Sequence, residues 1–316
     1  MKAVRAHRFG DPDVLSYEEV PRPEPSDDEV LVRVHTAGVN PIDRLVRRGD
    51  FGFLIDGEPP WIPGWDLSGV VEAVGSEVTE FERGDSVYGM VNMPGRGGTY
   101  AEYTTAPEED LALVPDAIGH TQAGGVPMVS QTAWRALFEE GNLQEGQSVL
   151  VHGAAGGVGH MAVQFASASG ARVIGTASGR DEKYLSKIGV DEFINYRTQR
   201  FEEKVQQADL VLDTVGGEVL ERSAEVLKPG GVLVTLPEEP SDGVKRRLRD
   251  RHDIETRYFS IEPDRKRLER ISGLIDSGEV EPTVQEVLPL SDARTAHRKS
   301  EDGHIRGKLV LDVDIT

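Results

Sequence analysis

The sequence predicts a two-domain α/β protein, in which a β-rich domain is joined to a domain built on a parallel sheet. Its 316 residues exceed the usual size of a single hydrophobic core, so two domains are expected. Residues 121–261 alternate apolar, strand-like runs with helical segments, which is typical of a parallel sheet with right-handed crossovers. Residues 1–120 show instead short strands separated by Gly, Pro and Asp, which favours a small β domain.

The β-rich part begins with short strands within residues 1–36. Further strands are expected at Ser68–Val74 and Ser86–Met90, and one or two more within residues 98–116. A helical segment around Ser130–Glu140 then leads into the second domain. We assign residues 1–122 and 262–316 to the first domain, because the tail of the chain, a helix followed by a strand, a short helix and a final strand, is expected to return to it.

The second domain, residues 123–261, opens with a βαβ unit. An apolar strand at Ser148–Val151 is followed by a glycine turn, an alanine-rich helix and a second strand at Arg172–Thr176. Later apolar runs predict the remaining strands of a doubly wound sheet. They lie at 191–196, 209–217, 228–236 and 254–261, with a helix at 218–227.

The glycine turn has the spacing of a dinucleotide-binding fingerprint, Gly153-x-x-Gly156-x-x-Gly159, with Gly157 as an additional glycine. Gly153 permits a tight turn, Gly156 or Gly157 lets the backbone approach a pyrophosphate, and Gly159 lets the helix lie close to the sheet. The pyrophosphate would lie at the positive end of the helix that starts near Gly157. The predicted cofactor-binding residues of this turn are Gly153, Ala155, Gly156, Gly157, Val158 and Gly159.

The end of the second strand favours NADPH over NADH. An NAD site usually has an Asp or Glu there that binds the ribose 2′-hydroxyl, whereas this chain has Ala177 and Ser178, followed by Arg180 and Lys183. A hydroxyl and two cations suit a 2′-phosphate. Asp181 is also close, but at the start of the next helix we expect it to act as a cap or first-turn acid.

Composition excludes several classes of protein. The chain has no cysteine, so disulfides and thiolate zinc sites are excluded. With 55 acidic and 35 basic residues the net charge is −20, which disfavours binding to nucleic acid. No apolar run has the length of a signal core or a membrane span, so we expect a cytoplasmic protein without membrane contacts. Dispersed acids with few lysines favour a salt-adapted, halophilic surface over that of an ordinary acidic enzyme.

Several segments resemble one known family. They include AGVNPID at 37–43, IPGWDLSGVVEAVG at 62–75, SVLVHGAAGGVGHMAVQFA at 148–166 and LKPGGVLV at 227–234. On these segments the chain is similar to the medium-chain dehydrogenase/reductase superfamily, and within it to the zinc-free NADPH:quinone oxidoreductases of the zeta-crystallin type. The resemblance implies a GroES-like catalytic domain and a Rossmann domain. It further implies that Ser178, Lys183 and Tyr196 hold the 2′-phosphate and that Thr132 lies near the nicotinamide ribose.

The departures from the superfamily pattern remove its zinc site. Zinc-dependent relatives have a Cys where this chain has Asn40, and a His and a Glu where it has Trp65 and Asp66. We therefore predict no metal. A hydride from NADPH would then pass to an acceptor already activated by conjugation, either a quinone or an α,β-unsaturated carbonyl compound.

Four residues are candidates for the acceptor site. Asn40 is the candidate catalytic residue, since its amide could bind the acceptor oxygen; the alternative is an asparagine that belongs to the turn before Pro41. Phe51, Phe53 and Trp65 are candidates for an apolar pocket that suits a flat acceptor, with domain core as the alternative.

Two other functions share the same motifs. The first is an enoyl-thioester (CoA) reductase, in which Arg44, Arg47 and Arg48 would bind CoA phosphates; an exposed helix end explains these arginines equally well. The second is a non-catalytic protein that binds NADPH in a structural or sensing role. We also expect a homodimer, formed through the sheet edge at 228–236 and 254–261.

Overall fold

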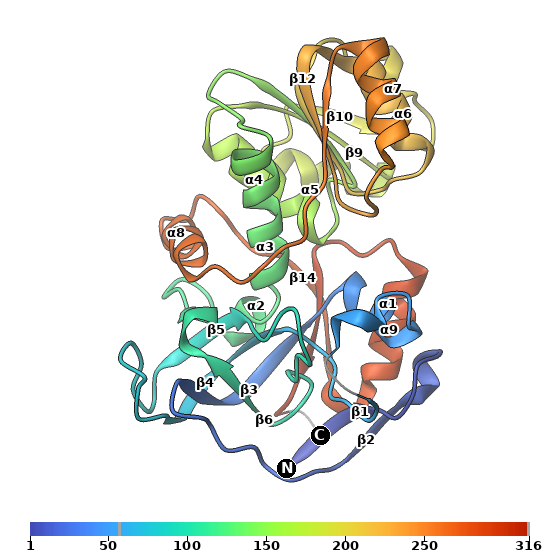
Figure 1. The fold of residues 1–316 in the computed structure, drawn as a ribbon. Coiled ribbons are helices and arrows are strands. Elements are labelled where there is room, and N and C mark those ends of the chain that lie inside the picture. Colours follow the sequence, from blue (N-terminus) through green and yellow to red (C-terminus); the bar gives the residue numbers. More distant parts are fainter. Residues whose placement is uncertain (56–57, 315–316) are drawn as a thin grey trace. The chain divides into compact units, whose positions relative to one another are not determined.

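The computed structural model describes residues 1–55 and 58–314 (Figure 1). The chain forms two compact units. Unit 1 comprises Met1–Gln131, Glu262–Gly278 and Pro282–Thr316, and unit 2 comprises Thr132–Ile261 and Glu279–Glu281. The predicted class, a β-rich domain with a doubly wound parallel sheet, is confirmed.

Unit 2 contains a six-stranded parallel sheet with strand order β10-β9-β8-β11-β12-β13. The first strand of the unit thus lies in the middle, and the chain winds outward from it in both directions, which is the doubly wound arrangement. The strands are β8 (Ser148–His152), β9 (Arg172–Ala177), β10 (Glu192–Asn195), β11 (Ala208–Asp213), β12 (Leu227–Thr235) and β13 (Glu255–Arg257). The sixth strand, expected within 254–261, is therefore present.

Helices cover both faces of this sheet, as right-handed crossovers require. Figure 1 shows α6 and α7 on the opposite side of the sheet from α4. The helices are α4 (Gly157–Ala168), α5 (Glu182–Lys187), α6 (Glu218–Ser223) and α7 (Asp242–His252). The apolar side chains of the strands are buried on both faces, which explains their nearly continuous apolar sequences.

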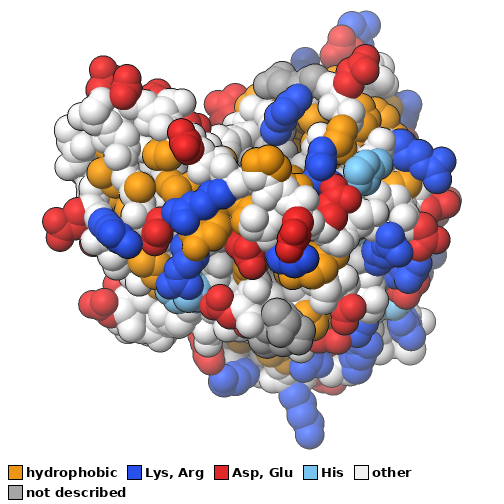
Figure 2. Space-filling view, turned by 90° about the horizontal axis from the view of Figure 1, so that it is seen from below, with side chains coloured by type: hydrophobic (Ala, Val, Ile, Leu, Met, Phe, Trp, Pro, Cys, Tyr) orange, Lys and Arg blue, Asp and Glu red, His pale blue; other side chains and the backbone are white. Residues whose placement is uncertain are grey.

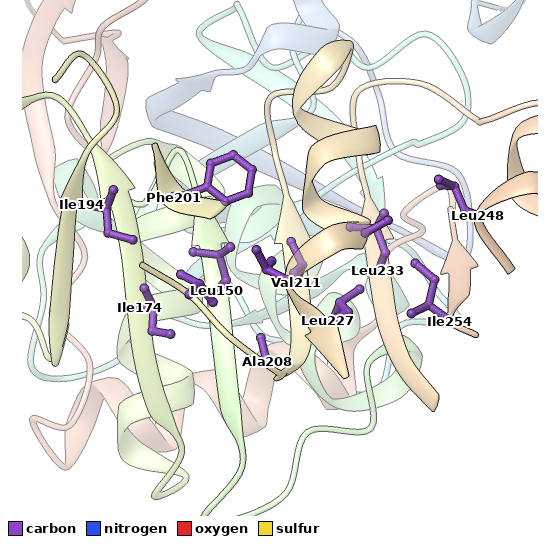
Figure 3. Packing of buried hydrophobic residues seen from close by; sticks show 13 residues of the cluster. Leu150, Ile174, Ile194, Phe201, Ala208, Val211, Leu227, Leu233, Leu248 and Ile254 are labelled. Atoms are coloured by element: carbon purple, nitrogen blue, oxygen red, sulfur yellow. The ribbon is translucent and has the colours of Figure 1, made fainter. Parts of the chain in front are cut away.

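The face covered by α6 and α7 has a continuous apolar core, shown in Figure 3. Leu150, Ile174 and Ile194 come from three neighbouring strands and point to the same face. Leu150 pairs with Ile174, and Ile194 pairs with Thr176, which lies two residues after Ile174 and therefore on the same side of β9. Leu248 of α7 packs against the same cluster and is 3% exposed. This core fixes the strand ends on which the candidate site is built.

Unit 1 is dominated by a seven-stranded sheet with the order β14-β15-β3-β4-β5-β7, in which β6 also pairs with β3. Its β15 runs antiparallel to β3, with Leu309 opposite Val39, so the final strand of the chain belongs to the first sheet. The strands are β3 (Glu29–Val39), β4 (Asp66–Val74), β5 (Ser86–Met90), β6 (Tyr103–Pro107), β7 (Leu111–Leu113), β14 (Val284–Pro289) and β15 (Lys308–Asp312). A separate hairpin-like pair is formed by β1 (Lys2–Ala6) and β2 (Leu15–Glu19).

In the described part of unit 1, α-helices accompany the strands. They are α1 (Pro41–Arg48), α2 (His120–Ala123), α3 (Pro127–Trp134, which continues into unit 2), α8 (Arg265–Asp276) and α9 (Ala293–Asp302). Residues 123–131, which the sequence analysis assigned to the second domain, belong to unit 1. They are held there because the Met128 amide donates to Asp66 Oδ1 at 2.8 Å and Gly124 lies directly against Thr36.

Acidic and basic side chains are interspersed on the face seen in Figure 2. This agrees with the dispersed acids of the sequence and gives no single-signed surface on that face. Within residues 1–55 and 58–314, no helix is both long and apolar enough to cross a bilayer.

Candidate functional site

The glycine turn lies at the point of unit 2 where the strand order reverses. Gly153 follows β8 with φ +65°, and a Cβ at this position would lie 2.4 Å from Thr214 Oγ1. The Thr214 hydroxyl donates to the carbonyl oxygen of His152 at 2.8 Å, which ties the ends of β8 and β11 together. Only glycine fits this conformation and this space. Ligands of doubly wound sheets bind at this reversal of strand order, beyond the carboxyl ends of the strands.

Gly159 brings helix α4 close to the turn. A Cβ on Gly159 would lie 2.2 Å from the carbonyl oxygen of Gly153 and 2.8 Å from Ala154 Cα. Gly156 is the N-cap of α4, which starts at Gly157. The first amides of a helix have no acceptor within the helix, so they are available to an anion. These residues therefore fit the pyrophosphate of a dinucleotide.

His152 organises the strand ends below the turn. Its Nδ1 and Nε2 lie 3.0 Å from Thr176 Oγ1 and 3.0 Å from Ser223 Oγ. Burial, with a smaller contribution from Arg222, lowers the pKa of His152 to about 3. The ring is therefore neutral at neutral pH, and it acts as a structural bridge between strands and helix α6.

A compact polar group follows β9. The Ser178 hydroxyl donates to Asp181 Oδ2 at 2.7 Å, and Arg180 Nε lies 3.5 Å from the same oxygen. Ser178 and Asp181 are 8% and 4% exposed, whereas the Arg180 side chain is 57% exposed and Lys183 of α5 is also exposed. The structure thus brings two predicted residues, Ser178 and Arg180, to a buried aspartate, and Lys183 lies two residues after that aspartate, in the first turn of α5.

Tyr196 belongs to the same end of the sheet. It follows β10, is 50% exposed, and its amide donates to the Ala177 carbonyl oxygen at 3.2 Å. The guanidinium of Arg197 lies 5.9 Å from the centroid of the Tyr196 ring. The sequence analysis did not consider Arg197, which adds a further cation beside Tyr196. Thr132 lies in α3 and is partly exposed.

In unit 1, Asn40 lies in a buried cluster with Asp66 and Lys308. Asn40 Nδ2 donates to Asp66 Oδ2 at 2.8 Å, and Lys308 Nζ donates to Asn40 Oδ1 and, at 2.9 Å, to the carbonyl oxygen of Val39. Lys308 Nζ also lies 3.8 Å from Asp66 Oδ2. Burial raises the pKa of Asp66, against the attraction of Lys308, and burial lowers the pKa of Lys308, against the attraction of Asp66.

Both polar atoms of the Asn40 side chain are thus engaged, and the residue is 1% exposed. Of the two alternatives for Asn40, this geometry supports the asparagine of the turn before α1. The sequence analysis missed Lys308, which lies 268 residues from Asn40 in the chain. The signal in the sequence was a lysine at the start of the apolar strand 308–312, which suggests a buried cation that needs a partner.

Asp43 closes the other side of the same turn. Its Oδ2 accepts from the Asn40 amide at 2.6 Å, the reverse half of a capping box, and from the Tyr100 hydroxyl at 3.0 Å. Its Oδ1 is buried without a hydrogen-bond donor. Burial raises the pKa of Asp43 to about 7, although the Asn40 amide and Lys308 oppose this. Asp43 therefore orders the start of α1.

The three arginines of α1 do not form one exposed basic group. Arg47 is fully buried; its guanidinium donates to Glu301 Oε1 at 2.5 Å and lies 3.1 Å from His297 Nδ1. Arg44 donates to the Ser300 carbonyl oxygen at 3.0 Å, and only Arg48 is exposed, paired with Asp50 at 3.4 Å. Arg47 is therefore not available to bind a CoA phosphate.

The predicted aromatic residues differ in their exposure. Phe53 is 77% exposed and lies 5.6 Å from the Phe51 ring, whereas Trp65 is 1% exposed. Phe9, which the sequence analysis did not consider, lies 5.0 Å from the Trp61 ring and against Gly52. Phe9, Phe51 and Phe53 therefore place aromatic rings around the short helix 52–54, while Trp65 belongs to the core of unit 1.

The comparison with known proteins follows this geometry. Residues 26–116 match the alcohol dehydrogenase GroES-like domain, and residues 188–311 match the zinc-binding dehydrogenase family. The quinone oxidoreductase of Mus musculus is 30% identical, over 98% of this chain and 97% of its own length. The chain belongs to the medium-chain dehydrogenase/reductase superfamily. Another member, an NADPH-dependent alkenal/one oxidoreductase of Arabidopsis thaliana, is 33% identical over 98% of this chain and 79% of its own.

Solved structures of superfamily members share the whole fold. The quinone oxidoreductase from Coxiella burnetii is 33% identical and superimposes with a TM-score of 0.93, covering 99% of both chains. The Escherichia coli quinone oxidoreductase complexed with NADPH is 26% identical, with a TM-score of 0.89, over 99% of this chain and all of its own.

The positions where the resemblance implied zinc ligands in zinc-dependent relatives carry other groups in this chain. Asn40 and Asp66 bind a buried lysine ammonium, and Trp65 contributes an indole. Among residues 1–55 and 58–314, no group of three or more His, Asp or Glu side chains is arranged to hold a metal ion.

Proposed function

We propose that this chain is an NADPH-dependent, metal-independent oxidoreductase that reduces quinones or α,β-unsaturated carbonyl compounds. The observation that carries the proposal is the glycine turn. Gly153 allows the tight turn after β8 and Gly159 allows α4 to lie close to it, so that the first amides of α4 are available to a pyrophosphate at the reversal point of a doubly wound sheet. Bound NADPH would supply the hydride. The chain itself has to bind the cofactor, orient it toward the acceptor and exclude water from the site.

The residues of unit 2 have distinct roles in this proposal. The turn residues 153–159 bind the pyrophosphate through the backbone, and Thr132 lies near the nicotinamide ribose. Ser178, Arg180, Lys183 and Tyr196 bind the 2′-phosphate. The cations are suited to this because they are exposed at the end of β9, where the adenosine ribose of a dinucleotide lies. The complex of the Escherichia coli relative with NADPH supports this cofactor.

The residues of unit 1 determine the class of acceptor. The side-chain oxygens of Asn40 and Asp66 lie next to the Lys308 ammonium, which occupies the place that a metal cation would take beside them. An acceptor that needs no Lewis acid fits this arrangement, since conjugation alone makes a quinone or an enone electrophilic. The exposed ring of Phe53 and the half-buried ring of Phe51 offer apolar surface to a flat acceptor, whereas Trp65 is buried. Asn40 acts by holding the turn before α1.

The relatives favour these acceptors as well. One is named a quinone oxidoreductase and another an NADPH-dependent alkenal/one oxidoreductase. The enoyl-CoA alternative loses its basic group, because Arg47 is buried against Glu301.

A steady-state assay tests the proposal. Oxidation of NADPH is followed by absorbance with 1,2-naphthoquinone and with an enone, at low and at high salt. We expect turnover with at least one acceptor. If NADPH were consumed with none of them, the proposal would be contradicted.

Dissociation constants for the double variant Arg180→Ala/Lys183→Ala should rise for NADPH far more than for NADH. Lys187→Ala, at the other end of α5, is the matched control and should change neither.

We also propose a homodimer formed through β13. This strand ends the sheet of unit 2 and pairs with β12 through Val232 opposite Glu255 and Val234 opposite Arg257. An unpaired strand edge favours pairing with a second copy. Light scattering coupled to gel filtration should give twice the mass of the chain, and a monomer at all concentrations would refute the dimer.

A further inference from the structure

Asp181 is an acidic residue buried where the cofactor's ribose is expected. It is 4% exposed, and its side chain makes no capping hydrogen bond to α5. The sequence analysis expected it to act as a cap. Its Oδ2 instead accepts the hydroxyl proton of Ser178 at 2.7 Å and lies 3.5 Å from Arg180 Nε. Asp181 is therefore coupled directly to two residues that we assign to NADPH.

The direction of the hydrogen bond decides what Ser178 can offer to a ligand. A hydroxyl has one proton to donate and two lone pairs that accept. While the Ser178 proton is donated to Asp181, its oxygen presents only lone pairs. These lone pairs suit a ribose 2′-hydroxyl, which can donate. A 2′-phosphate at neutral pH has almost only acceptor oxygens, so Ser178 can bind it only when its hydroxyl turns from Asp181 to the phosphate, which costs the hydrogen bond to Asp181.

The negative charge of Asp181 also disfavours NADPH relative to NADH. A 2′-phosphate carries about −1.5 to −2 charges at neutral pH, and a carboxylate one side chain away repels it. The exposed cations, Arg180 and Lys183, attract it. The end of β9 thus combines a group that suits NADH with cations that suit NADPH. Specificity is the difference between the two affinities, and a like charge lowers one of them selectively.

We propose that Asp181 is a positioning residue that reduces the preference for NADPH, so that the protein binds both NADPH and NADH. It acts through Ser178, whose hydroxyl it orients away from a phosphate and toward accepting a ribose hydroxyl. This inference rests on the proposed function, since it concerns the same cofactor site. It names a property of the site that the fold alone does not require, because neither the glycine turn nor the parallel sheet depends on Asp181.

Dissociation constants measured without an acceptor test this proposal. Quenching of tryptophan fluorescence gives the values for NADPH and NADH, and the ratio of the two is the readout. For Asp181→Asn we expect NADPH to bind more tightly and NADH more weakly, which increases the preference for NADPH about tenfold, the effect of one charge-assisted hydrogen bond. Asp181→Ala, which frees the Ser178 hydroxyl completely, should shift the ratio in the same direction.

Glu182→Gln is the matched control. It removes the same charge one residue away from an exposed position, so its effect on the ratio should remain below about twofold at physiological salt. A purely structural role of Asp181 would weaken both cofactors equally and leave the ratio unchanged, which would overturn the inference. An increase in the NADH preference would overturn it as well. If the unmodified protein bound neither cofactor, the proposed function itself would fail, which is a different result.

Discussion

Replacing Asp43 by asparagine should reduce the pH dependence of the stability of unit 1. Asp43 is 1% exposed, and burial raises its pKa to about 7 from 3.8; the Asn40 amide, Lys308 and the Tyr100 hydroxyl lower it, and Asp66 raises it further. The folded state therefore binds more protons than the unfolded state between about pH 4 and pH 7. Stability must fall as the pH rises through this window.

The size of the effect follows from the same two values. Each pKa unit corresponds to 1.36 kcal/mol, so ionising the buried Asp43 carboxyl costs up to about 4 kcal/mol above pH 7. Asparagine has nearly the same shape and keeps an oxygen for the Asn40 amide and the Tyr100 hydroxyl, but it never ionises. Its amide nitrogen replaces Oδ1, which has no donor, and this adds a cost that does not depend on pH. Comparing the free energy of unfolding at about pH 5 with that at about pH 8 separates the cost of ionising Asp43 from this constant cost.

Urea unfolding, followed by tryptophan fluorescence, measures the free energy of unfolding of the parent and the variant at each pH. In a Trp134→Phe background the remaining tryptophans, Trp61 and Trp65, both report on unit 1. The variant should gain about 2.5 kcal/mol relative to the parent between about pH 5 and pH 8, because part of the total of about 4 kcal/mol falls below pH 5. Asp28→Asn, an exposed acid, should give parallel pH profiles. Parallel profiles for Asp43→Asn, within about 1 kcal/mol, would show that Asp43 is not the group that titrates.

Three further predictions concern packing, the buried lysine and metals. Gly159→Ala places a Cβ 2.2 Å from a backbone oxygen of the glycine turn, so it should cost about 1–3 kcal/mol in urea unfolding and weaken NADPH binding. Gly273→Ala, a helical glycine with open space around it, should instead stabilise by about 0.5–1 kcal/mol; equal effects would contradict the packing argument. Lys308→Met leaves Asp66 buried without its cation and should cost about 3–5 kcal/mol in the same assay. Its control, Lys299→Met, removes a half-exposed ion pair worth about 0–1 kcal/mol. Dialysis against EDTA should leave the rate of NADPH oxidation unchanged, and a loss that zinc restores would refute metal independence.

The features that sequence predicted well are encoded locally. Gly153 and Gly159 are recognisable because a tight turn and a close helix require glycine at fixed spacing. The strands of unit 2 could be found because each is a short apolar run between a helix and a turn. Parallel pairing then follows from the alternation of strands and helices and from the handedness of the crossovers, whereas the strand order is known from the structure.

The buried polar contacts could not be predicted in this way. Lys308 and Asn40 are 268 residues apart, and no spacing rule connects a lysine at the start of one strand to an asparagine after another. Arg47 was expected at an exposed helix end, but it lies on the face of α1 that packs against α9 and its Glu301. The direction of the Ser178 hydroxyl is another such case. A sequence contains both the serine and Asp181, but it does not contain the rotamer that joins them.

The pairing of β15 with β3 has a consequence for the order in which the protein is made. Unit 2 is complete once residue 281 has been synthesised, whereas the sheet of unit 1 lacks a strand until residues 308–312 emerge. Synthesis proceeds at about 5–20 residues per second, so unit 2 can finish its sheet while unit 1 is still open. Lys308 arrives with that last strand. Until then Asp66 has no ammonium beside it, and the insertion of one side chain both closes the sheet and neutralises a carboxylate made more than two hundred residues earlier.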